Sequence, residues 1–206
     1  MRPNDCDVSE VKPLAKITFC DLNIDYVNAM QEVIENEFKF NSHKDLPFTI
    51  EAVCKDILKT QADFIVAPGN SFGVMSGGLD KVLRDYFGFQ LQRDVQRYIK
   101  NSARFELLVG ESIVISVHDD NFNNVIYAPT MRSPQKITDY EDVFLSTRSA
   151  ISNLSGMSKV PSVSIAAMGG LCGQVPPLVC AKKMFDGIAD AVNTFNSPRF
   201  TEITSW

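Results

Sequence analysis

The chain has 206 residues, of which 45% are hydrophobic and 22% are charged, and its formal net charge at pH 7 is −5. This composition is that of a globular protein and excludes a disordered or collagen-like chain. Lysine and arginine form no cluster that would neutralise a run of phosphates, so we expect no duplex nucleic acid as a partner. A small ligand with two or three phosphates remains allowed, because backbone N–H groups can bind it without basic side chains.

No apolar stretch is long enough to span a membrane, and the N-terminus lacks the basic start and apolar core of a signal peptide. We therefore expect a cytoplasmic protein without a membrane partner. The five cysteines include no C-x-x-C pair and are accompanied by only two histidines, so no metal site is predicted. We expect the cysteines to be free thiols.

Residues 1–13 are polar, contain two prolines and are predicted to form a mobile arm, and residues 14–206 are predicted to form a single domain. Beyond the arm, short segments rich in Val, Ile and Phe alternate with segments of helical periodicity. In chain order, we predict a strand at 15–21, a helix around 27–38, strands at 48–54 and 63–67, helices at 79–87 and about 90–104, strands at 111–117 and 124–128, a helix at about 138–154, a strand at 162–167 and a helix that begins near 176 and runs to 195. This alternation predicts an α/β fold, a three-layer α/β/α sandwich around a mixed, mostly parallel sheet of about six strands.

Ligands of such folds bind beyond the carboxyl ends of the strands, where loops run into helix N-termini. The segment Asp63–Asp80 joins a hydrophobic strand to a helix through a loop with four glycines. Glycines let the backbone approach an anion, and the helix N-terminus then offers free N–H groups and a positive dipole. A plain turn would explain the glycines equally well. The loop contains neither a Walker A motif nor G-x-G-x-x-G, which disfavours kinases and common dehydrogenases.

A second glycine-containing loop, within Ser162–Pro177, also follows a buried strand and leads into a helix. Two such loops at one edge of a sheet would clamp a diphosphate from both sides, which weakens the interpretation of either as a turn alone. Arg132 would reach a phosphate or face solvent, and His118 begins a segment typical of a polar loop.

The stretch Asn70–Asp80 resembles the first ligand loop of macro domains, in which an Asn is followed after six residues by Gly-Gly, an aliphatic residue and Asp. Three other segments match in order and spacing. Lys55–Ile57 resembles the Gly-Asp-Ile segment of the family, Ala128–Pro134 is similar to a segment of a phage and bacterial branch of macro-like proteins, and Gly169–Gly173 corresponds to the second phosphate loop. The resemblance covers roughly residues 15–195.

The resemblance implies a pocket for ADP-ribose or for an ADP-ribosylated protein, without a cofactor. Asp56 would accept a hydrogen bond from the adenine amino group, Ile57 would pack near the base, and Asn70 would hydrogen-bond the distal ribose. The phosphates would face the two loops, through Gly77, Gly78 and Leu79 on one side and Gly169, Gly170, Leu171, Cys172 and Gly173 on the other. From the residues alone, Asp56 as a solvated turn residue and Asn70 as an ordinary loop residue remain open.

Asn70 and Asp80 also correspond to the catalytic pair of macro domains that hydrolyse ADP-ribose from protein carboxylates or deacetylate O-acetyl-ADP-ribose. In those relatives, the pair positions or activates a water beside the distal ribose. A buried carboxylate near a phosphate would have a raised pKa and would serve as a general base. Alternatively, Asp80 is simply an acid favoured in the first turn of a helix.

Several departures from the family pattern keep other functions open. Ser76 replaces a glycine of many hydrolases, Gly169 and Gly170 replace Ser-Thr-Gly or a variant, and Cys172 replaces an aromatic residue that often shields the distal ribose. A less shielded ribose admits bulk water and positions the reacting water less well. In many family members a C-terminal aromatic stacks on adenine. Phe200 is the candidate for this role here, but Phe195, Phe200 and Trp206 are better interpreted as packing or tail residues.

The alternatives are a non-catalytic reader that recruits proteins to ADP-ribosylated partners, a phosphatase acting on ADP-ribose 1″-phosphate, and a degenerate pocket that serves only in assembly. No motif specifies the modified amino acid or the oligomeric state.

Overall fold

The computed structural model describes residues 13–40 and 46–195, and for residues 38–40 it describes the backbone alone. The predicted arm over residues 1–13 therefore lies almost wholly outside the described residues, as do Phe200 and Trp206. The strands are β1 (Ala15–Asp21), β2 (Phe48–Cys54), β3 (Ala62–Asn70), β4 (Ile113–Ser116), β5 (Phe122–Met131) and β6 (Ser162–Ile165). The helices are α1 (Ile24–Phe40), α2 (Gly78–Phe87), α3 (Phe89–Asn101), α4 (Glu141–Ser152) and α5 (Pro177–Asn193).

The strands form one mixed sheet in the order β2-β1-β6-β3-β5-β4, in which only β4 runs antiparallel to its neighbour. The predicted α/β fold with a mostly parallel sheet of six strands is confirmed. Strands β3 and β5 are longer than predicted, because they pair from Ala62 opposite Phe122 to Asn70 opposite Met131, through Pro68 and Pro129. Sequence reasoning ended both strands at the prolines, but the parallel pairing continues past them.

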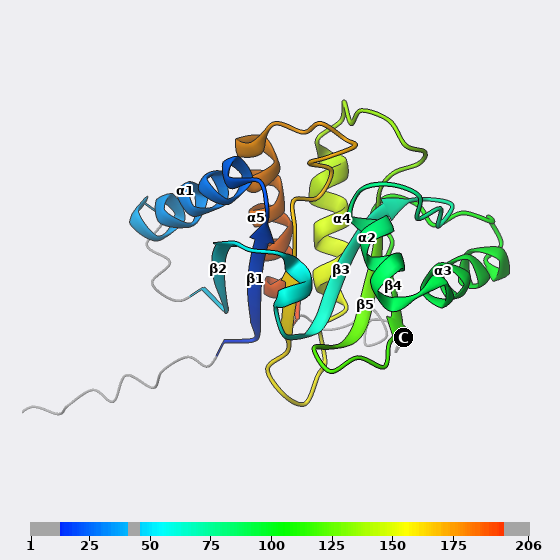
Figure 1. Cartoon of the computed structure of the whole chain (residues 1–206). Coiled ribbons are helices and arrows are strands. Elements are labelled where there is room, and N and C mark those ends of the chain that lie inside the picture. The colour runs from blue at the N-terminus through cyan, green and yellow to red at the C-terminus, as the bar shows by residue number, and fades with distance from the viewer. Residues whose placement is uncertain (1–12, 41–45, 196–206) are drawn as a thin grey trace, which may run out of the picture.

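The sheet separates two hydrophobic cores. Along β3, Phe64 and Val66 pack into the core beneath α1, α4 and α5, whereas Ile65 and Ala67 pack into the core beneath α2 and α3. Figure 1 shows the same division, with α1, α4 and α5 on one face of the sheet and α2 and α3 on the other. The four consecutive apolar residues 64–67 of β3 are thus buried on both faces of the sheet, as expected of a central parallel strand.

The topology brings two distant loops together. Because β6 lies between β1 and β3, the loop from β6 to α5 leaves the sheet beside the loop from β3 to α2, at the same carboxyl edge. Among the described residues, no helix is long and apolar enough to cross a membrane.

Candidate functional site

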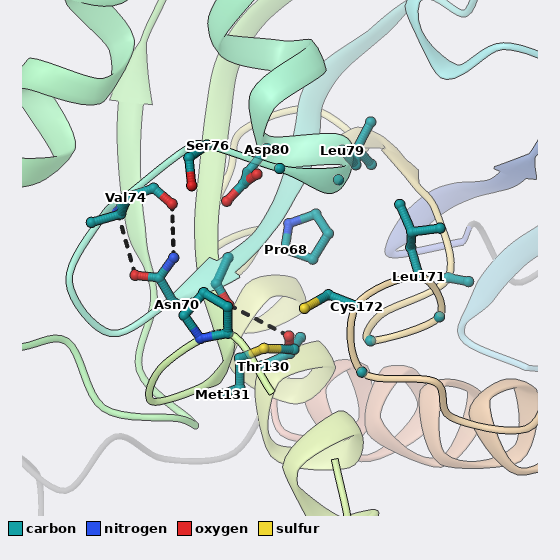
Figure 2. Close-up of a pocket in the computed structure, with 18 residues that line it drawn as sticks. Pro68, Asn70, Val74, Ser76, Leu79, Asp80, Thr130, Met131, Leu171 and Cys172 are labelled. Atoms are coloured by element: carbon teal, nitrogen blue, oxygen red, sulfur yellow. Dashed lines mark hydrogen bonds between the residues drawn. The ribbon is translucent and has the colours of Figure 1, made fainter. Parts of the chain in front are cut away.

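The first loop leaves β3 at Asn70 and enters α2 at Gly78. The side-chain amide of Asn70, which is buried, organises this loop: its Nδ2 donates to the carbonyl of Val74 (2.8 Å), and its Oδ1 accepts from the backbone N–H groups of Phe72 (3.1 Å) and Val74 (3.3 Å). Figure 2 shows the hydrogen bonds between the Asn70 side chain and Val74. One N–H of the Asn70 amide is left for a ligand.

The end of the first loop exposes backbone N–H groups. Gly78 opens α2 with a φ of +62°, a left-handed conformation that favours glycine, and no side chain caps the helix at Gly77. A Cβ atom on Gly77 would meet nothing within 4 Å, so the backbone borders open space there. This helix N-terminus, with its free N–H groups and positive dipole, suits an anion.

The second loop, from β6 to α5, is held by a residue that lies far away in the sequence. The hydroxyl of Tyr26, on α1, lies 3.0 Å from the carbonyl oxygen of Gly170 and 2.7 Å from that of Val175. A Cβ atom on Gly170 would lie only 3.0 Å from the Tyr26 ring, so the loop packs tightly against this ring. Tyr26 therefore holds this loop from the side of α1, and the opposite side of the loop lines the cavities described next.

Two cavities lie between these loops. The inner cavity, of about 220 Å³, is bordered by Asn70 and Asp80, and the outer cavity, of about 460 Å³, by Asp56 and Ile57. Both are lined by the facing tips of the two loops, namely Gly78, Leu79, Ala167, Gly170 and Leu171. The two cavities thus adjoin along the tips of the loops, and together they offer one elongated site of a size typical for small ligands.

All of the candidate site residues predicted from the sequence line one of these cavities. The outer cavity contains Asp56 and Ile57, and the inner cavity contains the others: Asn70, Gly77, Gly78, Leu79, Asp80, Gly169, Gly170, Leu171, Cys172 and Gly173. Asp56 has a local role as well, since its Oδ1 accepts from the N–H of Leu58 (3.0 Å) and caps a short 3-10 turn. The turn-residue interpretation and the ligand-facing interpretation of Asp56 are therefore compatible.

Asp80 is the most unusual side chain of the inner cavity. It is only 6% exposed, and its Oδ1 has no hydrogen-bond partner among the described residues. Burial raises the pKa of the carboxyl to about 6, against the opposing effects of the backbone at Lys81 and Gly77 and of the charge on Arg84. An acceptor that is buried without a partner at a cavity wall is costly, and it marks a candidate binding or catalytic group.

Sequence reasoning missed several residues of the site. Asp21 and Tyr26 line the outer cavity, and Thr130 and Met131 line the inner one. Asp21 also supports the second loop, since its Oδ2 accepts from the N–H of Ala167 (3.3 Å). Thr130 and Met131 belong to the Ala128–Pro134 segment, whose resemblance to the family was the available signal. Asp21 and Tyr26 are far from both loops in sequence, and only the fold brings them to the site.

Arg132 and His118, two polar residues considered in the sequence analysis, line neither of the two cavities. Arg132 pairs with Glu106 (2.8 Å) and stacks over the ring of Phe72, and its side chain is largely exposed. The segment at His118 is a polar loop, in which Asp119 accepts from the N–H groups of Asn121 (2.9 Å) and Phe122 (3.2 Å). Neither residue lines the inner or the outer cavity.

The cysteines Cys20, Cys54, Cys172 and Cys180 are free, and Cys6 lies outside the described residues. Burial raises the pKa of Cys20 and of Cys180 to about 12, so both thiols are inert at neutral pH. In the part of the chain that the structure covers, no group of three or more His, Cys, Asp or Glu side chains is arranged to hold a metal ion.

Solved structures share this fold at low sequence identity. The macrodomain of Mycobacterium tuberculosis DarG matches with a TM-score of 0.58 and 16% identity, over 66% of this chain and 87% of that one. The macrodomain of Oceanobacillus iheyensis, in a structure with ADP, matches with a TM-score of 0.57 and 21% identity, over 67% of this chain and 73% of that one. A mutant of the same macrodomain was solved with ADPR.

Sequence comparison leads to the same family. An uncharacterized protein of Aquifex aeolicus is 32% identical over 139 residues, which cover 68% of this chain and 80% of that protein. The family model described as the macro domain matches residues 66–184, a range that includes both loops and the residues of the inner cavity. The chain therefore belongs to the macro domain family.

Proposed function

We propose that this macro domain binds ADP-ribose along the two cavities and hydrolyses the bond between the distal ribose and a protein side chain. The observation that carries the proposal is the position of the buried Asp80 carboxylate, whose Oδ1 has no hydrogen-bond partner among the described residues, at the wall of a cavity between the two loops. The relatives solved with ADP and ADPR support the choice of ligand.

In the proposed complex, the diphosphate lies where the tips of the two loops approach each other. The uncapped N-terminus of α2 faces one phosphate and the second loop faces the other, so backbone N–H groups supply most of the hydrogen bonds. This mode of binding suits a chain with a net charge of −5, because it needs no cluster of basic side chains. The adenosine occupies the outer cavity beside Asp56 and Ile57, and the distal ribose occupies the inner cavity.

The chemical step follows from the state of Asp80. With a pKa of about 6, this carboxyl is largely ionised at neutral pH and is a stronger base than an ordinary aspartate. Asp80 takes a proton from a water, and the water oxygen attacks C1″ of the distal ribose. The bond from C1″ to the protein side chain breaks, and its electron pair leaves with the side-chain oxygen. The free N–H of Asn70 holds a hydroxyl of the ribose during this step.

A direct test uses a protein that carries ADP-ribose on a glutamate side chain. The wild type should release ADP-ribose, and Asp80→Ala should bind free ADP-ribose but lose turnover by about 100-fold or more, as expected for removal of a general base. The same assay with O-acetyl-ADP-ribose tests the acetyl ester as an alternative substrate. Release of inorganic phosphate from ADP-ribose 1″-phosphate would instead identify a phosphatase.

A non-catalytic reader is the second candidate, and two observations favour it. The Asn70 amide is largely engaged in holding its own loop, and at position 172 a small thiol borders the inner cavity instead of a large ring. A reader would bind ADP-ribosylated protein without releasing the nucleotide, and Asp80→Ala would leave its affinity unchanged.

A further inference from the structure

Ser76 brings a second unengaged polar group to the wall of the inner cavity. It lies four residues before Asp80, at the end of the first loop, and its side chain is exposed. Both residues line the inner cavity, and Figure 2 shows the Ser76 hydroxyl and the Asp80 carboxylate directed into the same space. The Ser76 hydroxyl forms no hydrogen bond with the described part of the chain.

The two groups do not bond to each other, since the Ser76 hydroxyl has no hydrogen-bond partner among the described residues, and neither does Asp80 Oδ1. Their chemistry is complementary toward a water molecule. The carboxylate oxygen accepts one proton of a water, and the hydroxyl oxygen of a serine accepts the other. A water held at two points has a fixed orientation, whereas a water held by one carboxylate rotates freely about a single hydrogen bond.

We propose that Ser76 is a positioning residue, which holds the attacking water together with Asp80 and directs its lone pair toward C1″ of the distal ribose. This inference rests on the hydrolysis proposed above and identifies a residue of the same site. In the balanced step, one water proton passes to Asp80 and the new bond forms between the water oxygen and C1″. The ester bond at C1″ breaks, and the side-chain carboxylate leaves with its electron pair. The proton on Asp80 then returns to solvent.

The surroundings of Ser76 argue against a purely structural role. Its neighbour Gly77 borders open space, and the turn itself is held by other groups, because the Met75 N–H donates to Gln92 (3.2 Å) and Arg84 donates to the Met75 carbonyl (2.6 Å). Removal of the Ser76 hydroxyl therefore breaks no bond that shapes the loop.

The test compares Ser76→Ala and Ser76→Thr with the wild type, using a glutamate-linked ADP-ribosylated protein as the substrate. We expect Ser76→Ala to lower kcat about tenfold, the value of one ordinary hydrogen bond, with KM and the Kd values of ADP-ribose and ADP within about twofold of wild type. Ser76→Thr keeps a hydroxyl and should recover most of kcat. Ser152→Ala is the matched control, since the exposed Ser152 hydroxyl bonds only to Arg148 on α4 and should be dispensable.

Three results would overturn this role, and they differ in what else they affect. If Ser76→Ala weakens ADP and ADP-ribose equally, the hydroxyl contacts a phosphate instead. If Ser76→Ala retains the kcat of the wild type, Ser76 does not position the water, although hydrolysis stands. If the wild type binds ADP-ribose but releases none from the modified protein, both the hydrolysis and the role of Ser76 are wrong.

Discussion

The phenol oxygen of Tyr127 lies 2.9 Å from the backbone nitrogen of Asn70 and 2.8 Å from its carbonyl oxygen. Tyr127 is fully buried, and this burial raises its pKa, so its hydroxyl stays protonated and able to donate. The pairing register between β3 and β5 shifts at this same point, between Gly69 and Asn70. Tyr127, on β5, thus holds the backbone of Asn70 at the point where the first loop leaves the sheet. The side chain of the same Asn70 organises that loop.

This contact predicts that Gly69→Ala strongly destabilises the protein. A Cβ atom on Gly69 would lie 2.2 Å from the Tyr127 oxygen, so the ring must move and the two hydrogen bonds to Asn70 are lost. We expect the free energy of unfolding to fall by about 3 kcal/mol or more, as measured by urea denaturation. A loss below about 1 kcal/mol would show that the ring is displaced easily.

Gly77→Ala should leave the stability of the protein nearly unchanged but weaken the binding of ADP. The added methyl group meets nothing within 4 Å and the backbone is extended, so the free energy of unfolding should change by less than about 1 kcal/mol. The methyl group would nevertheless stand in the space assigned to a phosphate, and we expect the Kd of ADP to rise at least about tenfold. Calorimetric titration of ADP measures this effect, and unchanged affinity would exclude a phosphate at Gly77.

The sequence predicted the order and type of the strands and helices well, because alternation of apolar strands with amphipathic helices is a local pattern. It also located the two loops, since glycines between a strand and a helix are visible without a structure. It did not reveal Tyr127 and Tyr26, which hold those loops from 57 and 144 residues away. Such contacts depend on strand order and helix placement, and neither tyrosine has a local signature. The lack of a hydrogen-bond partner for the buried Oδ1 of Asp80, among the described residues, likewise depends on how the folded chain packs.

Tyr26→Phe should loosen the second loop. The substitution removes a hydroxyl that serves the carbonyls of Gly170 and Val175, and it leaves those part-buried acceptors without this partner. We expect a loss of about 1–2 kcal/mol in stability and a several-fold weaker affinity for ADP. Tyr86→Phe is the matched control, because its hydroxyl bonds to Asp119 at an exposed site. Equal behaviour of the two variants in ADP binding would mean that Tyr26 does not preorganise the site.

Hydrolysis should depend on pH through Asp80. The base must be ionised, so kcat should rise with pH, with a midpoint near 6, and level off above about 7. Burial at the cavity wall raises the pKa of this carboxyl, and the backbone at Lys81 and Gly77 and the guanidinium of Arg84 lower it. Single-turnover rates between pH 4.5 and 8 measure the midpoint. A rate that is constant over this range would exclude Asp80 as the base.

Asp80→Asn should stabilise the protein at neutral pH. The carboxyl has a pKa of about 6 in the folded state and 3.8 as its ordinary value, so the folded state holds the proton more tightly. The stability of the wild type therefore falls as pH rises from about 4 to about 6, and the ionised group costs roughly 1–3 kcal/mol above that window. Replacing it with a neutral amide should raise Tm by several degrees at pH 7.5 and hardly at all at pH 4.

Asp85→Asn is the control for this comparison. Asp85 lies on the same helix, is exposed, and has a pKa lowered by Lys81 and Arg84, so its neutral analogue should not stabilise the protein at pH 7.5. Equal shifts in Tm for both variants would indicate a general effect of charge rather than burial of Asp80.

The most direct test of the central claim is a calorimetric titration of the wild type with ADP-ribose, ADP and AMP. If the two cavities hold adenosine and distal ribose with the diphosphate between them, ADP-ribose should bind with a micromolar Kd. ADP, which leaves the inner cavity empty, should bind more weakly, and AMP, which also lacks the second phosphate, most weakly. Asn70→Ala should then reduce the advantage of ADP-ribose over ADP. No measurable binding of any of the three nucleotides, or equal affinity for AMP and ADP-ribose, would contradict the assignment.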